Sequence, residues 1–209
     1  MKMLLSLLVV ALIGVGAWFY FFAEPPQDTN DNGTATSTLS YRSTEYGVSF
    51  THPFDWLVSE ASLFGTPAIN VYAPGQEEQP PYIHHNNVTN VSIFPDGVPT
   101  EGLFAPTRPL ALNLPFSATG TMFVLNDGTP FAAYIRPLER PTSWGEAGFI
   151  WMRVGISDLE STCYDAAGTE LAENACDPMT EDHEIRWSGT VDASEWQKLL
   201  AILRTLTLE

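Results

Sequence analysis

Two cysteines are the first residues whose spacing points to chemistry. Cys163 and Cys176 are the only cysteines of the 209-residue chain, and the segment between them is polar and acidic. Outside the cytoplasm such a pair forms a disulfide, and closing a loop of this size stabilises a fold by about 3 kcal/mol. We therefore predict a Cys163–Cys176 disulfide, with free or metal-binding thiols as the alternative.

The segment around these cysteines is rich in carboxylates and contains no basic side chain. Ca²⁺ takes six to eight oxygen ligands, so a divalent-cation site is one interpretation. The spacing fits no EF-hand loop, and a solvated acidic loop is the other interpretation, so we name no metal ligands. The acids are Asp158, Glu160, Asp165, Glu170, Glu173, Asp177, Glu181, Asp182 and Glu184.

Histidines raise a second metal-binding hypothesis. His84 and His85 are adjacent, and His183 lies among acids. Imidazole suits zinc and nickel, but adjacent side chains of a strand point to opposite faces and rarely bind one ion together. We expect surface loop residues, with no metal site and no cofactor.

Ser49, His52 and Asp55 are the residue types of a catalytic triad. Placed on one strand and its following turn, they do not easily converge with an oxyanion hole. Nucleophile-elbow, metalloprotease and phosphate-loop motifs are absent from the sequence. We predict a protein that is not an enzyme, with a hydrolase assembled from distant residues as the less favoured alternative. Trp144 and Trp151 are either core or rim aromatics, or part of an aromatic binding groove.

The first element that the sequence predicts is an apolar N-terminal segment. Leu4 to Phe22 carries no charge and as a helix reaches roughly 28 Å, close to the ~30 Å hydrocarbon core of a bilayer. Lys2 precedes it and acids follow it, which places the N-terminus in the cytoplasm. We predict an N-terminal transmembrane anchor or signal segment in 1–22, a flexible linker in 23–40 and a globular domain in 41–209 outside the cytoplasm. The alternative is a cleaved signal, with a small-residue site at 15–17, and a secreted domain.

The charge of the chain limits the classes of partner that the protein can bind. The formal net charge is -16, from 25 acids and 9 bases. So acidic a surface repels phosphate backbones, which excludes nucleic acid. The charge either keeps the domain soluble or attracts a cationic ligand or partner.

Alternating apolar residues predict a mostly antiparallel sheet with few helices. Residues 148–156 are apolar nearly throughout and predict a central strand. Asp192 and Glu195 form a capping-box pattern before an apolar stripe, which predicts a C-terminal helix. A second helix is expected near Pro53, and a short helical turn within 96–105. Strands are expected at 48–52, 68–72, 90–94 and 183–191, with a hairpin over 121–138 and a return to the sheet edge at 205–208. The fold class expected is α+β.

One stretch resembles a known family. Tyr46, Gly47, Ser49, Phe50, Pro53 and Trp56 match the opening signature of PsbP-like domains, and residues 195–209 are similar to the family's closing helix and strand. The resemblance implies an α-β-α sandwich, an antiparallel sheet flanked by helices, and a non-enzymatic module. The motif's own content is structural, because Pro53 ends a strand and Phe50 and Trp56 are suited to a core.

Together these features predict an extracytoplasmic, membrane-anchored, non-catalytic binding or accessory domain. The N-terminal helix contacts the membrane, and the partner is a protein or a cationic ligand. A divalent-cation binder using residues 158–184 is the alternative.

Overall fold

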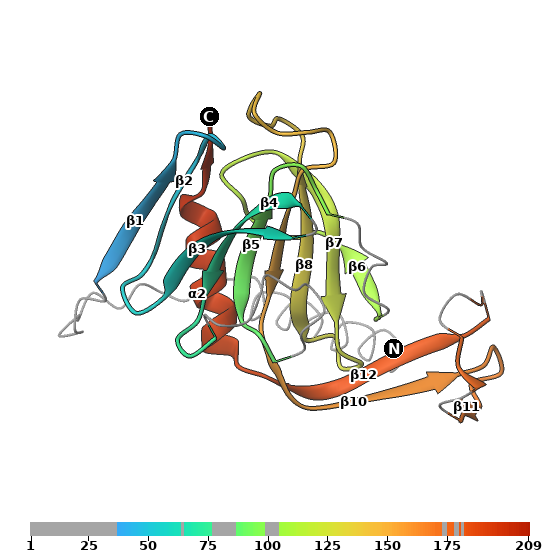
Figure 1. Ribbon diagram of the computed structural model, residues 1–209. Helices are drawn as coiled ribbons and strands as arrows, with labels where there is room; N and C mark the ends of the chain where they lie inside the picture. The colour runs from blue at the N-terminus through green and yellow to red at the C-terminus, as the bar shows by residue number, and fades with distance from the viewer. Residues whose placement is uncertain are drawn as a thin grey trace, which may run out of the picture. The chain divides into compact units, whose positions relative to one another are not determined.

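The computed structural model describes residues 37–63, 65–76, 87–98, 105–172, 175–177, 180 and 182–209. These residues form thirteen strands and a single helix, arranged in three antiparallel sheets (Figure 1). The expected α+β fold with a sheet flanked by helices is therefore wrong, and the described domain is mostly β.

The largest sheet has seven strands in the order β3-β4-β5-β9-β8-β7-β6. β9 lies near its middle and every one of its residues is buried, as the apolar run predicted. The predicted hairpin is present, and its turn is held by Asp127, whose carboxylate accepts a hydrogen bond from Thr129 N at 2.8 Å. The strands are β3 Leu57–Leu63, β4 Thr66–Tyr72, β5 Asn90–Phe94, β6 Thr107–Pro109, β7 Ala118–Val124, β8 Pro130–Pro137 and β9 Phe149–Arg153.

A second sheet joins the two ends of the domain. β1 (Thr38–Ser43) pairs with β2 (Val48–Pro53), and β13 (Thr207–Leu208) adds to the other edge of β2. The predicted strand over 48–52 and the predicted return at the C-terminus are both confirmed. β1 begins within the range expected for the linker, because Thr38 to Ser40 pair with Thr51 to Pro53.

Helix α2 (Ala193–Thr205) follows the predicted C-terminal pattern. The Asp192 side chain caps it by accepting from Ser194 N at 2.8 Å and Glu195 N at 3.4 Å. The carboxylate of Glu195 accepts from Lys198 at 2.6 Å instead of completing the capping box. Hydrogen bonds from the Ser194 hydroxyl and from the backbone lower the pKa of Asp192, so this cap is strongest when the carboxylate is ionised.

The core has a layer on each face of the seven-stranded sheet. α2 packs against β2 and β9, and its apolar stripe covers one face, where Ile93, Ile150 and Met152 are fully buried. The opposite face carries an aromatic cluster that includes Phe94, Phe123, Phe131, Phe149, Trp151 and Trp187. The apolar stripe of α2 consists of Trp196, Leu199, Ile202 and Leu203.

The helix expected near Pro53 is a turn followed by a strand. Trp56 N donates to Pro53 O at 3.0 Å, and residues from Leu57 onward pair with β4. Glu60, Ala61 and Leu63 are good helix formers, but cross-strand pairing with a distant segment outweighs local propensity. Of the helical turn expected within 96–105, residues 99–104 lie outside the described part of the chain.

The opening motif has the structural role that the sequence indicated. β2 ends at Pro53, and Phe50 and Trp56 are 2% and 1% exposed. Gly47 has φ +60°, and a Cβ built there would lie 2.5 Å from Glu209 O. Gly47 therefore allows the β1–β2 turn and the close approach of the C-terminus, whose Glu209 N donates to Gly47 O at 2.8 Å.

Gly47→Ala should destabilise the domain more than Gly75→Ala does. Both glycines have positive φ, but a Cβ at Gly75 meets nothing within 4 Å. Gly75→Ala should lower the free energy of unfolding by about 1–2 kcal/mol, the cost of a left-handed alanine. Gly47→Ala adds the displacement of Glu209, and urea denaturation measures the difference. If both variants lose the same free energy of unfolding, the displacement of Glu209 makes no contribution.

No helix in the described part of the chain is long and apolar enough to cross a membrane. The predicted anchor in 1–22 lies outside the described residues.

Candidate functional site

The third sheet is formed by the chain segment that follows β9. It contains β10 (Ile156–Tyr164), β11 (Glu170–Leu171) and β12 (Glu184–Val191), with β10 in the middle. We call the described residues between Ile156 and Val191 the arm. Figure 1 shows β10 and β12 as a long two-stranded ribbon with β11 at its far end.

The disulfide predicted from the sequence closes the far end of the arm. The Cys163 and Cys176 sulfurs are 2.09 Å apart, and their Cα atoms are 5.9 Å apart. Because an isolated two-stranded ribbon is only marginally stable in water, a covalent link at its far end limits fraying. The acidic segment thus forms part of a cross-linked hairpin, and four of its acids lie in strands: Asp158, Glu160, Glu170 and Glu184.

One of the acids holds the turn between β10 and β11. The Asp165 carboxylate accepts hydrogen bonds from Ala167 N at 2.9 Å and Thr169 N at 2.8 Å. Gly168 follows with φ +79°, the conformation that such turns need and that glycine adopts without strain. Asp165 therefore has a structural role in the arm.

The strand register gives the far end of the arm two different faces. Cys163 pairs with Leu171 on one side and Ile185 on the other, so these three side chains share one face with the disulfide. Tyr164 pairs with Glu170 and Glu184, so the opposite face is polar. Residues directly across a sheet point the same way, which makes one face apolar and the other acidic.

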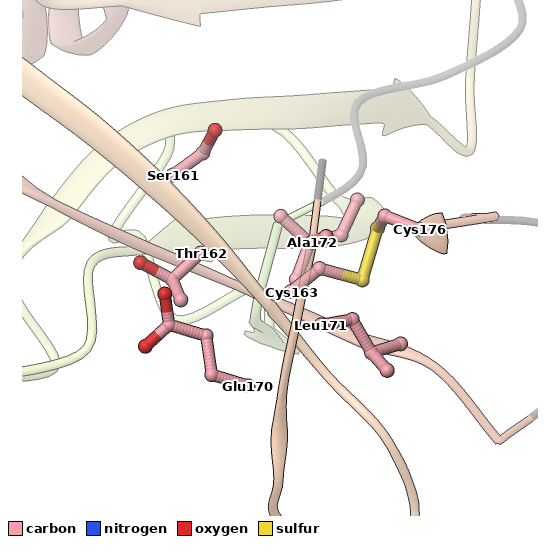
Figure 2. Close-up of a pocket in the computed structure, with 8 residues that line it drawn as sticks. Ser161, Thr162, Cys163, Glu170, Leu171, Ala172 and Cys176 are labelled. Carbon is pink, nitrogen blue, oxygen red and sulfur yellow. A yellow bond between two sulfur atoms is a disulfide. The ribbon is translucent and has the colours of Figure 1, made fainter. Parts of the chain in front are cut away.

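A groove of about 470 Å³ lies at the far end of the arm. Ser161, Thr162, Leu171, Ala172 and Ile185 line it together with the disulfide and Glu170. Figure 2 shows the disulfide beside Leu171 and Ala172, with the Glu170 carboxylate near Thr162. The groove thus combines an apolar surface with hydroxyl and carboxylate groups at its margin.

A basic side chain organises the polar face. Arg186 donates to Glu184 through two hydrogen bonds of 3.1 and 3.0 Å, and its guanidinium carbon lies 4.3 Å from the centre of the Tyr164 ring. The hydrogen bonds lower the pKa of Glu184 and raise the pKa of Arg186. This pairing satisfies one carboxylate of the arm without a metal ion.

Aromatic stacking holds the middle of the arm against the large sheet. The Trp187 ring stacks on Phe131 of β8 with centroids 5.4 Å apart and planes 13° apart. Trp187 O also accepts a hydrogen bond from Asn126 N at 2.9 Å. The arm therefore joins the aromatic core cluster through β12.

The described structure shows no arrangement of side chains that supports the metal-binding hypotheses. No group of three His, Cys, Asp or Glu side chains that could hold a metal ion occurs within the described ranges. The His183 ring nitrogen Nδ1 lies 3.0 Å from Asp177 N, which donates to it. His84, His85, Glu173 and Glu181 lie outside the described residues.

Ser49, His52 and Asp55 do not come together. Ser49 and His52 alternate to opposite faces of β2: the Ser49 hydroxyl bonds Thr207 Oγ1 at 2.6 Å, whereas His52 is buried beside Phe50. Asp55 is exposed in the turn that follows. These three residues form no triad.

The two tryptophans considered for a binding groove are core residues. Trp144 is 8% exposed and donates from Nε1 to Tyr46 O at 2.7 Å. Trp151 is 4% exposed and packs 5.4 Å from Phe123. Neither offers an open aromatic surface.

A buried polar row on the large sheet is a feature that the sequence reading missed. Ser92 Oγ donates to Asn70 Oδ1 at 2.5 Å and accepts from Asn90 Nδ2 at 2.6 Å. Arg153 pairs with Asn90 across the strands, and its burial lowers the pKa of the guanidinium to about 10. The available signal was the polar residues inside otherwise apolar strand segments.

Arg153 also connects this row to the arm. Its guanidinium carbon lies 5.8 Å from the centre of the Phe131 ring, the ring on which Trp187 stacks. A buried cation near an aromatic ring is attracted by the π electrons on the face of the ring. Phe131 therefore contacts both Arg153 of the polar row and Trp187 of the arm.

Comparison with protein-family models, curated proteins and solved structures finds no match for this chain.

Proposed function

We propose that this protein is an extracytoplasmic, membrane-anchored binding domain without catalytic activity, and that the arm is its contact surface for a protein partner. The observation that carries the proposal is the groove of mixed apolar and polar lining beside the Cys163–Cys176 disulfide at the far end of the arm.

The groove supports a protein partner because of its construction. Leu171 and Ile185 are half-buried and share a face with the disulfide, while Glu170 lies at the margin. An apolar centre with polar and charged groups around it is the usual anatomy of a protein contact surface. The acidic groups of the arm favour a partner whose matching surface is basic.

The disulfide supports a location outside the cytoplasm. Disulfides persist in oxidising compartments, where small or extended elements use them for stability. The apolar run Leu4–Phe22 supplies the anchor of this proposal, and the resemblance of the Tyr46–Trp56 motif to PsbP-like domains remains a hypothesis that is compatible with a binding role.

A binding role fits the candidate residues better than catalysis or cation binding does. Ser49, His52 and Asp55 have separate structural surroundings, and Asp165 is engaged in a turn. Glu184 is paired with Arg186. The geometry thus favours an interaction surface over either alternative.

Photocrosslinking in native membranes tests the proposal. A photoreactive amino acid at Ala172, which is exposed and lines the groove, is compared with one at Ala111, which is exposed outside the arm. We expect one protein to be crosslinked from position 172, and excess unlabelled protein should compete for it. Leu171→Asp should abolish that product, because a charge replaces an apolar contact in the groove.

Position 111 is the control for crosslinking from position 172. Crosslinking of the same protein from positions 172 and 111 would contradict a contact surface on the arm. Crosslinking from position 172 that persists in Leu171→Asp would show that the groove is not the contact.

A further inference from the structure

The described domain exposes apolar side chains unevenly. Four large hydrophobic residues are exposed in the described ranges: Leu39 at 52%, Phe54 at 59%, Leu57 at 49% and Leu138 at 61%. Single exposed apolar residues are ordinary on a soluble surface, but a cluster marks a contact site. The first three belong together, and we call them the N-terminal patch.

Backbone contacts place the three residues at one corner. Phe54 N donates to Ser37 O at 3.0 Å, and Leu39, two residues after Ser37, pairs with His52. Leu57 begins β3 three residues after Phe54. The patch therefore surrounds the point at which the preceding chain joins the described domain.

Leu138 lies elsewhere. It is three residues from Pro141, whose side chain lies beside Gly47 in the β1–β2 turn. Leu39 and Phe54 lie at the opposite end of that hairpin, whose two strands have six residues each, roughly 20 Å away along strands that rise about 3.3 Å per residue. Leu138 is thus a matched exposed residue outside the patch.

The chain that precedes Ser37 suggests what covers the patch. The charge-free run ends at Phe22, and the polar residues from 23 to 36 separate it from Ser37. A flexible tether of about 15 residues spans roughly 22 Å on average. Such a tether raises the effective concentration of the tethered surface to the millimolar range, so a weak contact is sufficient.

We propose that the N-terminal patch docks on the uncharged interfacial region of the bilayer that anchors the chain. This inference rests on the membrane anchor of the proposed function. Apolar side chains bind the interface by burying area at the boundary of headgroups and acyl chains. Asp55 and Glu60 are exposed beside the patch, so zwitterionic lipid suits it better than anionic lipid.

The test uses the full chain in phosphatidylcholine vesicles with a polarity-sensitive fluorophore on Phe54→Cys. The matched control carries the same fluorophore on Leu138→Cys. We expect a blue shift at position 54, quenching there by lipids spin-labelled near the headgroup, and neither effect at position 138. Replacing part of the lipid with phosphatidylglycerol should reduce the blue shift at position 54.

A second variant checks that the patch itself makes the contact. With the fluorophore on Leu39→Cys, adding Phe54→Ser and Leu57→Ser should abolish the blue shift, while circular dichroism remains that of the wild type. These side chains are exposed, so the fold should tolerate the changes.

Three results would overturn the docking proposal. If the protein floats with the vesicles but position 54 stays in water, the anchor holds and the patch does not dock. A blue shift without quenching by lipid would show that protein, such as a second copy of this chain, covers the patch. If the protein does not float with the vesicles, both the anchor and the docking proposal fail.

Discussion

Trp187→Ala should lower the free energy of unfolding by about 3–5 kcal/mol, the range for truncating a large buried aromatic side chain. Trp187 is 8% exposed and belongs to the aromatic cluster on the large sheet. Its removal eliminates the stack on Phe131 and leaves a cavity between the arm and the large sheet. Urea denaturation measures the loss, and hydrogen exchange should locate its largest effect in β10 and β12.

Two control variants separate the stack from other effects. Trp187→Phe should cost less than half as much, because a ring remains over Phe131 and Trp187 Nε1 makes no hydrogen bond within the described structure. Ser188→Ala changes an exposed neighbour and should stay within about 0.5 kcal/mol of wild type. If Trp187→Ala behaves like Ser188→Ala, the arm is not held through this contact.

Removal of the disulfide should loosen the far end of the arm. In the double variant Cys163→Ala/Cys176→Ala we expect the free energy of opening of this region to fall by about 3 kcal/mol. Faster hydrogen exchange should appear in β11 and in the adjoining residues of β10 and β12. β5 and β9 should keep their protection, because they belong to a different sheet and proteins open in local units.

Reduction of the wild-type protein provides the matched control for this variant. A reductant should reproduce the exchange pattern of the double alanine variant and leave that variant unchanged. A uniform increase in exchange through β5 and β9 would contradict a local role for the disulfide. Under the proposed function, the double variant should also lose crosslinking from position 172.

These two predictions describe an element that is fixed at two points. Its middle is attached through Trp187 and Phe131, and its far end is closed by the disulfide. A rigid contact surface loses less conformational entropy when it binds than a mobile one. The arm is therefore built in a way that favours recognition.

Much of the strand pattern was predictable, because its signals are local. The Asp127-Gly128 turn, the all-buried β9 and the cap at Asp192 each depend on neighbouring residues. The two predicted helical features near Pro53 and in 96–105 rested on weak periodicity. The former is β3, whose pairing with β4 is a tertiary contact.

Of the strands of the arm, β12 confirms the strand predicted at 183–191, whereas β10 was harder to predict because it lacks a continuous apolar face. β10 reads Ile-Ser-Asp-Leu-Glu-Ser-Thr-Cys-Tyr, and most of its residues are exposed or half-buried. Such a sequence satisfies the pattern of a solvated loop as well as that of a strand. Pairing with β12 decides between them, and Asp158 with φ +51° lies at the irregularity where the register shifts.

Local sequence was sufficient to predict the disulfide, the C-terminal end of β2, the start of α2 and the buried centre of the large sheet. In each case a property of the local chain is sufficient: the number of thiols, the fixed φ of Pro53, the Asp192 cap or an unbroken apolar run. The folded structure was needed to place Ser49 and His52 on opposite faces, to place Leu171, Cys163 and Ile185 on one face, and to bring Phe54 beside the segment that contains Leu39. Those arrangements depend on strand register and on contacts between segments that are distant in the chain, and a one-residue shift of register would reverse every face.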